Sequence, residues 1–187
     1  EEHPLHGGTG IAHTRWATHG EPSEANAHPH VSEHIVVVHN GIIENYASLK
    51  EKLQEKGYSF KSSTDTEVLV QLIEFIQKSK NTDLLTAVQL ALREVIGAYA
   101  IAVIANDNPN HMVVARMGCP LLIGLGEEEV FIASDVSAVV ALTRQIMYLE
   151  DGDIALLGTQ GIKKILDKTG AIPNRAIKTS QVSLASL

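Results

Sequence analysis

The apolar residues in the first half of the chain follow helical spacing over three segments, at about 42–56, 64–76 and 83–95. Gly57 and Gly97 follow the first and third segments at positions that suit a helix C-terminus. Thr64 and Glu67 have the spacing of a capping box, so the second helix should begin there. The pattern therefore predicts three amphipathic helices.

Extended segments surround these helices. A run of β-branched residues at 34–39 predicts a strand buried on both faces, and the Asn40-Gly41 pair should end it. Residues 10–15 predict a short strand, followed by a loop at 17–33 that is rich in Gly, Pro, Ser and Asn. The later elements should be a short helix at 134–141 and strands at 99–105, 112–116, 120–125, 130–133, 146–150, 154–157 and 162–166.

This order of elements favours an α+β layered sandwich, in which helices pack on antiparallel sheets, over a doubly wound parallel sheet. Many of the strands are close enough in sequence to be joined as hairpins. The glycines at 7–10 lack the lysine and the spacing of a phosphate-binding loop. We expect one domain at 1–170 and a tail or linker at 171–187, where the hydrophobic pattern fades.

Composition narrows the class of partners. The chain of 187 residues is 44% apolar and carries a net charge of −7, which argues against binding to nucleic acid or an anionic membrane. The single cysteine, Cys119, excludes an intrachain disulfide and fits a reducing compartment, so we expect a cytoplasmic protein. The polar residues at 1–4 do not resemble a signal peptide and are a poor start for a domain. We therefore expect that an upstream segment is missing.

The segment 13–20 (HTRWATHG) is the strongest candidate for a binding loop. Arg15 carries a planar, permanently charged fork that suits a carboxylate, although a structural salt bridge to an acidic residue would use it equally well. Trp16 is the only tryptophan, and it fits either a core position or a gate over a site. The segment predicts a loop that grips a ligand at the end of a strand.

Two further positions have both a structural and a chemical interpretation. Asn40-Gly41 is a favoured hairpin turn, but a helical pattern follows it, so an Asn amide beside a free Gly N–H could form an oxyanion hole. Asp65 either favours the helix dipole or binds an ammonium group. If Arg15 and Asp65 share one pocket, they complement the zwitterion of an α-amino acid.

Eight of the nine histidines fall within positions 3–39, which raises the question of a metal site. The His28-Pro29-His30 spacing is too short for a helical ligand pair, and no other metal motif supports it, so we expect no metal. His13 and His19 flank Arg15 and are the better site candidates. Cys119 has no adjacent base in the sequence, and we interpret it as an inert core thiol.

Taken in order, the segments 13–20 (HTRWATHG), 26–30 (NAHPH), 39–45 (HNGIIEN) and 64–67 (TDTE) resemble the glutaminase domain of class II glutamine amidotransferases, which have the N-terminal nucleophile hydrolase fold. The RWATHG string is similar in particular to the glutamine–fructose-6-phosphate aminotransferases. The resemblance extends from residue 1 to about residue 170. It implies L-glutamine as substrate, no cofactor, a homo-oligomer, and a sugar-isomerase domain in the same polypeptide.

The resemblance also assigns roles. Arg15 would bind the α-carboxylate of glutamine and Asp65 its α-amino group, while Thr18 and His19 would line the same pocket. Asn40 and the Gly41 N–H would form the oxyanion hole, and Trp16 would belong to a closing loop. His13 and His28 are further candidates without an assigned role.

One departure from the family is large. Its nucleophile is a cysteine at the mature N-terminus, and this chain begins without one, so we expect the chain alone to be inactive. The alternatives are a non-catalytic module that senses glutamine, a glutaminase domain of another class II amidotransferase, and a metal-binding histidine module.

Overall fold

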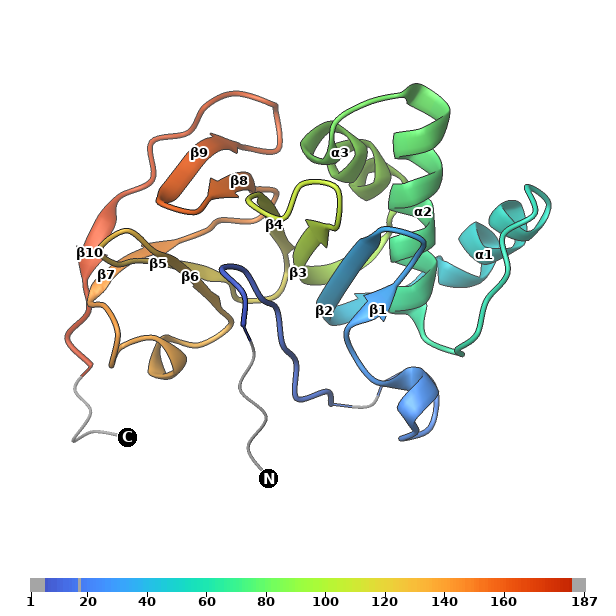
Figure 1. Cartoon of the computed structure of the whole chain (residues 1–187), viewed down its shortest axis with the longest axis horizontal. Coiled ribbons are helices and arrows are strands. Elements are labelled where there is room, and N and C mark those ends of the chain that lie inside the picture. The colour runs from blue at the N-terminus through green and yellow to red at the C-terminus, as the bar shows by residue number, and fades with distance from the viewer. Residues whose placement is uncertain (1–5, 17, 183–187) are drawn as a thin grey trace.

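The computed structural model describes residues 6–16 and 18–182, which form three layers: helices, a six-stranded sheet and a four-stranded sheet (Figure 1). The six-stranded sheet has the order β1-β2-β3-β4-β8-β9 and the four-stranded sheet the order β10-β7-β5-β6, with antiparallel neighbours throughout. The strands are β1 (His30–Val31), β2 (Ile35–Ile43), β3 (Gly97–Ala105), β4 (Met112–Met117), β5 (Leu122–Leu125), β6 (Val130–Ala133), β7 (Gln145–Tyr148), β8 (Ile154–Gly158), β9 (Gly161–Leu166) and β10 (Ile177–Thr179).

The helices are α1 (Tyr46–Gln54), α2 (Asp65–Lys80) and α3 (Leu84–Glu94), and two short 3₁₀ turns lie at η1 (Glu24–Asn26) and η2 (Val136–Ala138). Thr64 caps α2 by accepting a hydrogen bond from the Glu67 N–H, as the spacing predicted. The Glu67 carboxylate, however, accepts from the backbone of Lys61 and Ser62, so the capping box is only half formed. Asp83 caps α3 through the Thr86 N–H.

Two hydrophobic cores separate the three layers. One packs the helices against one face of the six-stranded sheet through residues such as Ile35, Val37, Ile73 and Val103. The other fills the space between the sheets, where Val38 and Val114 of the larger sheet meet Ile123 of the smaller one. Because side chains alternate along β2, this strand is apolar on both faces, as its uninterrupted run of β-branched residues predicted.

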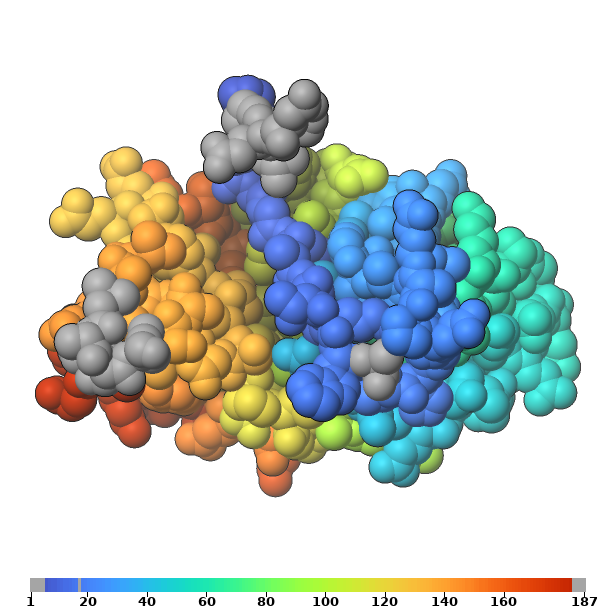
Figure 2. Space-filling model, turned by 90° about the horizontal axis from the view of Figure 1, so that it is seen from below, coloured from blue at the N-terminus to red at the C-terminus, as the bar shows by residue number. Residues whose placement is uncertain are grey.

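The segment 6–16 differs from the prediction, because it forms no strand. A strand needs a partner for its backbone groups, but the Arg15 N–H bonds to the side chain of His13, and Arg15 itself has a φ of 47°. Ile11 packs against the core between the sheets. In Figure 2 this dark-blue segment runs between the orange residues of the smaller sheet and the light-blue residues around β1 and β2.

Three other boundaries were wrong. The pair Asn40-Gly41 does not end β2, which continues to Ile43 in register with β3. The helix expected at 134–141 is only the 3₁₀ turn η2, capped by Asp135. The segment expected as a tail contributes β10, which pairs with β7, and Arg175 bonds to the buried carboxylate of Asp153 at 2.7 and 2.8 Å. No helix in the part of the chain that the structure describes is long and apolar enough to cross a bilayer.

Candidate functional site

A cavity of about 260 Å³ opens where the end of β2 meets the start of α2 and the loop 13–19. Segments that are far apart in the sequence contribute to it, and every residue proposed for the site from the sequence lines it. The lining residues are His13, Arg15, Trp16, Thr18, His19, His28, His39, Asn40, Gly41, Ile42, Thr64, Asp65 and Thr66.

Arg15 supplies the cation of this cavity. Its guanidinium donates to the backbone oxygens of His19 at 3.0 Å, Gly20 at 3.1 Å and Glu21 at 3.2 Å, which fixes the side chain across its own loop. Within residues 6–16 and 18–182, no carboxylate pairs with it, so the salt bridge that we considered from the sequence is not formed there. Trp16 follows it and is 90% exposed, which excludes the core position for this side chain.

Asp65 supplies the anion, and it is only 3% exposed at the first turn of α2. Its Oδ2 accepts a hydrogen bond from the Ile43 N–H at 2.8 Å, which ties the start of the helix to the end of β2. A buried carboxylate is costly unless it is hydrogen-bonded or paired. Asp65 and Arg15 therefore place one charge of each sign on the wall of one cavity without forming an ion pair with each other.

Asn40 and Gly41 reach the cavity from the strand itself and not from a turn before a helix. The bond from the Glu44 N–H to the Ile96 oxygen marks 44–96 as a hydrogen-bonded pair of the β2–β3 ladder. Along an antiparallel ladder, pairs that exchange hydrogen bonds alternate with pairs that do not. Gly41 is paired with Tyr99, three positions from the 44–96 pair, so these two residues exchange no hydrogen bonds. Its N–H therefore points away from β3, on the side where the Ile43 N–H meets Asp65.

Gly41 is the residue type that this position requires. Its φ is 122°, a value that residues with a side chain rarely adopt. A Cβ there would lie 2.1 Å from the backbone oxygen of Ala98 and 3.1 Å from the Sγ of Cys119. Cys119 is thus next to the site, but burial raises the pKa of its thiol, which favours the unreactive protonated form.

Four histidines form one wall of the site and its surroundings. His13 stacks on His28, with ring centroids 4.3 Å apart, and His28 meets His30 edge to face at 5.1 Å. Burial, and then the neighbouring His13, His30 and His39, lower the pKa of His28 to about 3. Burial also lowers the pKa of His30 and of His39. These three rings are therefore neutral near pH 7.

The hydrogen bonds of His28, Thr66 and His39 assign the tautomers of the two rings. The backbone N–H of His39 donates to Nδ1 of His28 at 3.3 Å, so the proton of the neutral His28 ring is on Nε2. That Nε2 lies 3.4 Å from Thr66 Oγ1. The Thr66 hydroxyl donates to Nδ1 of His39 at 3.0 Å, and Nε2 of His39 faces the Ala98 oxygen at 3.4 Å. With both rings neutral, each donor of the array has an acceptor, which agrees with the lowered pKa of His28 and His39.

Sequence reasoning missed part of this site. It did not propose His39, Ile42, Thr64 or Thr66 for the site, although all four line the cavity. Thr66 lies within the 64–67 motif, one residue after Asp65, but its role as the bridge between two histidines depends on contacts from β2 and from the loop before β1. Those contacts leave no local signal in the sequence.

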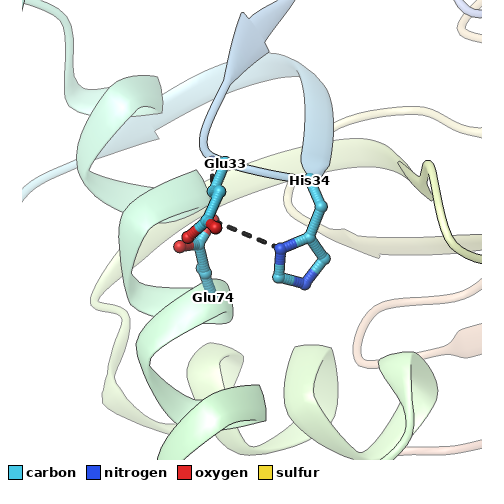
Figure 3. A group of neighbouring side chains, drawn as sticks. All are labelled: Glu33, His34 and Glu74. Atoms are coloured by element: carbon cyan, nitrogen blue, oxygen red, sulfur yellow. Dashed lines mark hydrogen bonds and ion pairs between the residues drawn. The ribbon is translucent and has the colours of Figure 1, made fainter.

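A second group of polar side chains lies at the other end of β2 and α2. Glu33, His34 and Glu74 have potential ligand atoms within 4.8 Å of one another, and this is the one such group found among the described residues (Figure 3). The ammonium of Lys78 bonds to both carboxylates, so a cation of the chain already occupies the position that a metal would need. The histidine wall itself does not have this ligand geometry.

Comparisons with known proteins identify the class. The fold is similar to a solved glutamine phosphoribosylpyrophosphate amidotransferase from Bacillus subtilis, with a TM-score of 0.68 and 28% identity over 86% of this chain and 35% of that one. This similarity confirms the expected N-terminal nucleophile hydrolase-like α+β sandwich.

A family model for the glutamine amidotransferase domain matches residues 13–141, and the chain belongs to this family. It is 57% identical over all of its 187 residues to the glutamine–fructose-6-phosphate aminotransferase (isomerizing) of Neisseria meningitidis. It is 54% identical over 185 residues to that of Bacteroides thetaiotaomicron. The chain spans about 30% of the length of these relatives.

Proposed function

We propose that this chain is the glutamine-binding part of a glutaminase domain that releases ammonia for the synthesis of glucosamine 6-phosphate. The single observation that carries the proposal is the cavity that Arg15 and Asp65 line together with Asn40 and Gly41. The similarity to the two aminotransferases supports the choice of acceptor sugar. In this proposal the sugar-isomerase domain, homo-oligomerisation and a cytoplasmic location are properties of the longer protein.

The geometry supports a different role for each of these residues. The Arg15 guanidinium binds the α-carboxylate of L-glutamine, and the buried Asp65 carboxylate binds its ammonium group, which orients the side-chain amide toward the end of β2. Thr18 and His19 line the cavity, and the exposed Trp16 belongs to the loop that closes over the substrate. His28 contributes a neutral surface.

The chemical step is acyl transfer. A thiolate attacks the amide carbon, the carbonyl electrons move onto oxygen, and the Asn40 amide and the Gly41 N–H stabilise that oxyanion. As the intermediate collapses, its nitrogen takes up the proton that the thiol gave up, so the C–N bond breaks with release of ammonia and a thioester remains. Water then hydrolyses the thioester to glutamate and free thiol. The one thiol in this chain, Cys119, has its pKa raised by burial, which favours the unreactive protonated form, so the chain by itself should not turn over.

Two versions of the protein test this function. Glutamate release should be absent from the chain alone and present when an N-terminal segment of the family, beginning with its cysteine, is placed before residue 1. Turnover by the chain alone would contradict the role assigned to an N-terminal cysteine. No turnover by the extended version, with its fold intact by circular dichroism, would contradict the glutaminase assignment.

Calorimetry on the chain alone tests the binding site separately. L-Glutamine should bind, and analogues that lack the α-carboxylate (4-aminobutanamide) or the α-amino group (glutaramic acid) should each bind at least about tenfold more weakly. Equal affinity for the three ligands would contradict the roles of Arg15 and Asp65. Tight and selective binding without any turnover by the extended version would favour a glutamine sensor.

A further inference from the structure

The orientation of the Asn40 carboxamide decides whether it can stabilise an oxyanion. Only its NH₂ group donates hydrogen bonds, and if the amide were turned by 180° its oxygen would face the developing negative charge. The side chain therefore needs a fixed partner on its oxygen. His13 is that partner, because its Nε2 lies 2.6 Å from Asn40 Oδ1.

The tautomer of His13 is set by the backbone. The Arg15 N–H donates to Nδ1 of His13 at 2.8 Å, so Nδ1 carries no proton. A neutral imidazole then has its proton on Nε2, which makes this atom a donor to Asn40. The acceptor must be the carboxamide oxygen, and the two N–H bonds of Asn40 point away from His13.

The surroundings hold the His13 ring in place from two sides. One face stacks on His28 at a 25° interplanar angle, and the array of His39 and Thr66 fixes His28 in turn. The edge is held by the backbone N–H of Arg15, which donates to Nδ1. His13 thus connects the loop that carries Arg15 to the Asn40 amide.

We propose that His13 is a positioning residue, which directs the Asn40 NH₂ group toward the oxyanion through its Nε2–H and supports the Arg15 loop through Nδ1. The inference rests on the proposed function, since it assigns the oxyanion hole to Asn40. The two ring nitrogens of His13 then have different roles: Nε2 supports stabilisation of the transition state, and Nδ1 supports substrate binding.

Two substitutions separate these tasks in the extended, active version. In His13→Asn the Oδ1 atom can replace Nδ1 as the acceptor for the Arg15 N–H, but no donor reaches Asn40. We expect kcat to fall about 10- to 100-fold, which is less than the roughly 10²- to 10³-fold loss on removing an oxyanion donor outright, because the Asn40 side chain is still present. The KM for glutamine should stay near the parent value. In His13→Gln the Nε2 donor is kept and the Nδ1 acceptor is lost, so KM should rise and kcat should change less than in His13→Asn.

A double mutant with Asn40 and a control substitution at His111 complete the test. In an Asn40→Ala background, His13→Asn should lower kcat no further, because the donor it positions is gone. His111→Asn, in the turn between β3 and β4, changes the same residue type away from the site and should leave both constants unchanged. An unchanged kcat in His13→Asn, or an equal loss in both backgrounds, would overturn the inference while leaving the proposed function intact.

A spectroscopic measurement on the chain alone does not depend on turnover. Long-range ¹H–¹⁵N correlations near pH 7.5 should show His13 with its proton on Nε2. The Asn40 side-chain NH₂ signals should shift in His13→Asn more than in His13→Gln. A proton on Nδ1 in the parent chain would contradict the hydrogen bond on which the inference depends, whether or not the extended version is active.

Discussion

Strand β2 and helix α2 run in opposite directions, and each end of the pair carries histidine and carboxylate side chains that are arranged in different ways. At one end, the charges of Glu33 and Glu74 meet Lys78 directly, and His34 completes a closed group (Figure 3). At the other end, Asp65 and Arg15 line a cavity and bond to backbone groups instead of each other. At the first end, which we call the closed end, the charged groups pair with one another. At the second, which we call the open end, one charge of each sign faces the cavity.

The comparison teaches that residue types alone do not define a site. Both groups combine acidic and imidazole side chains, and the group with the tighter cluster of potential ligand atoms is the one that we interpret as structural. What distinguishes the cavity is that neutral histidines and backbone bonds hold its polar groups in place. The following substitutions test this difference, beginning with the largest expected effect.

Gly41→Ala should damage the open end most. The new Cβ would lie 2.1 Å from the Ala98 backbone oxygen at a φ of 122°, so β2 and β3 would have to separate. We expect a loss of about 3 kcal/mol or more in the free energy of unfolding, measured by urea denaturation. The matched control is Gly57→Ala, where φ is 88° but nothing lies within 4 Å of the new Cβ, and the loss should be about 1 kcal/mol. Similar losses at the two positions would contradict the close approach at Gly41.

Arg15→Ala should affect ligand use more than stability. Since its guanidinium has only backbone oxygens as partners among the described residues, removing it should weaken glutamine binding by about 1.5–3 kcal/mol. Calorimetry on the chain and the KM of the extended version both measure this effect. Arg15→Lys keeps the charge without the fork and should recover only part of the loss. A KM equal to that of the parent would refute the carboxylate assignment.

Glu74→Gln tests the closed end. The side chain of Glu74 is 4% exposed and pairs with Lys78, which is 45% exposed, so solvent screens part of the interaction. Loss of the charge should cost about 1–2 kcal/mol of unfolding free energy and leave glutamine affinity unchanged. Glu33→Gln is the control, because its carboxylate is 74% exposed and should contribute under about 0.5 kcal/mol. A loss of glutamine affinity in Glu74→Gln would mean that the two ends are coupled.

The sequence predicted local features better than distant ones. Helix α2 begins where the Thr64 cap placed it, because a cap acts over three residues. The segment 10–15 has the pattern of a strand, but a strand forms only where its backbone groups have a partner, which can lie anywhere in the chain. Here the Arg15 N–H donates to the side chain of His13 instead. For the same reason, no local pattern could show that β10 would pair with β7.

The residues of the candidate site could also be predicted only where the signal was local. The residues Arg15, Asn40, Gly41 and Asp65 were found from the order of their motifs, and the fold brings them to one cavity. The Asn40-Gly41 pair was placed in the wrong backbone setting, because a glycine with positive φ can continue a strand as well as end one. The hydrogen bonds of these histidines join four separate segments, 13–15, 28–30, 39–40 and 64–66, so only the structure reveals them.

The last prediction concerns the pH dependence of stability, which depends on the neutral histidines that support the open end. Burial lowers the pKa of His28 from its ordinary 6.5 to about 3, so between these values the unfolded chain binds a proton that the folded chain does not. Stability therefore has its full value above pH 6.5 and falls as the pH drops toward 3. His28→Asn keeps an acceptor for the His39 N–H without a titrating ring, so it should be less stable than the parent at pH 7.5 but lose less between pH 6.5 and 4. Melting temperatures of the two proteins over this range measure the difference, and parallel curves would show that His28 does not contribute a buried neutral ring.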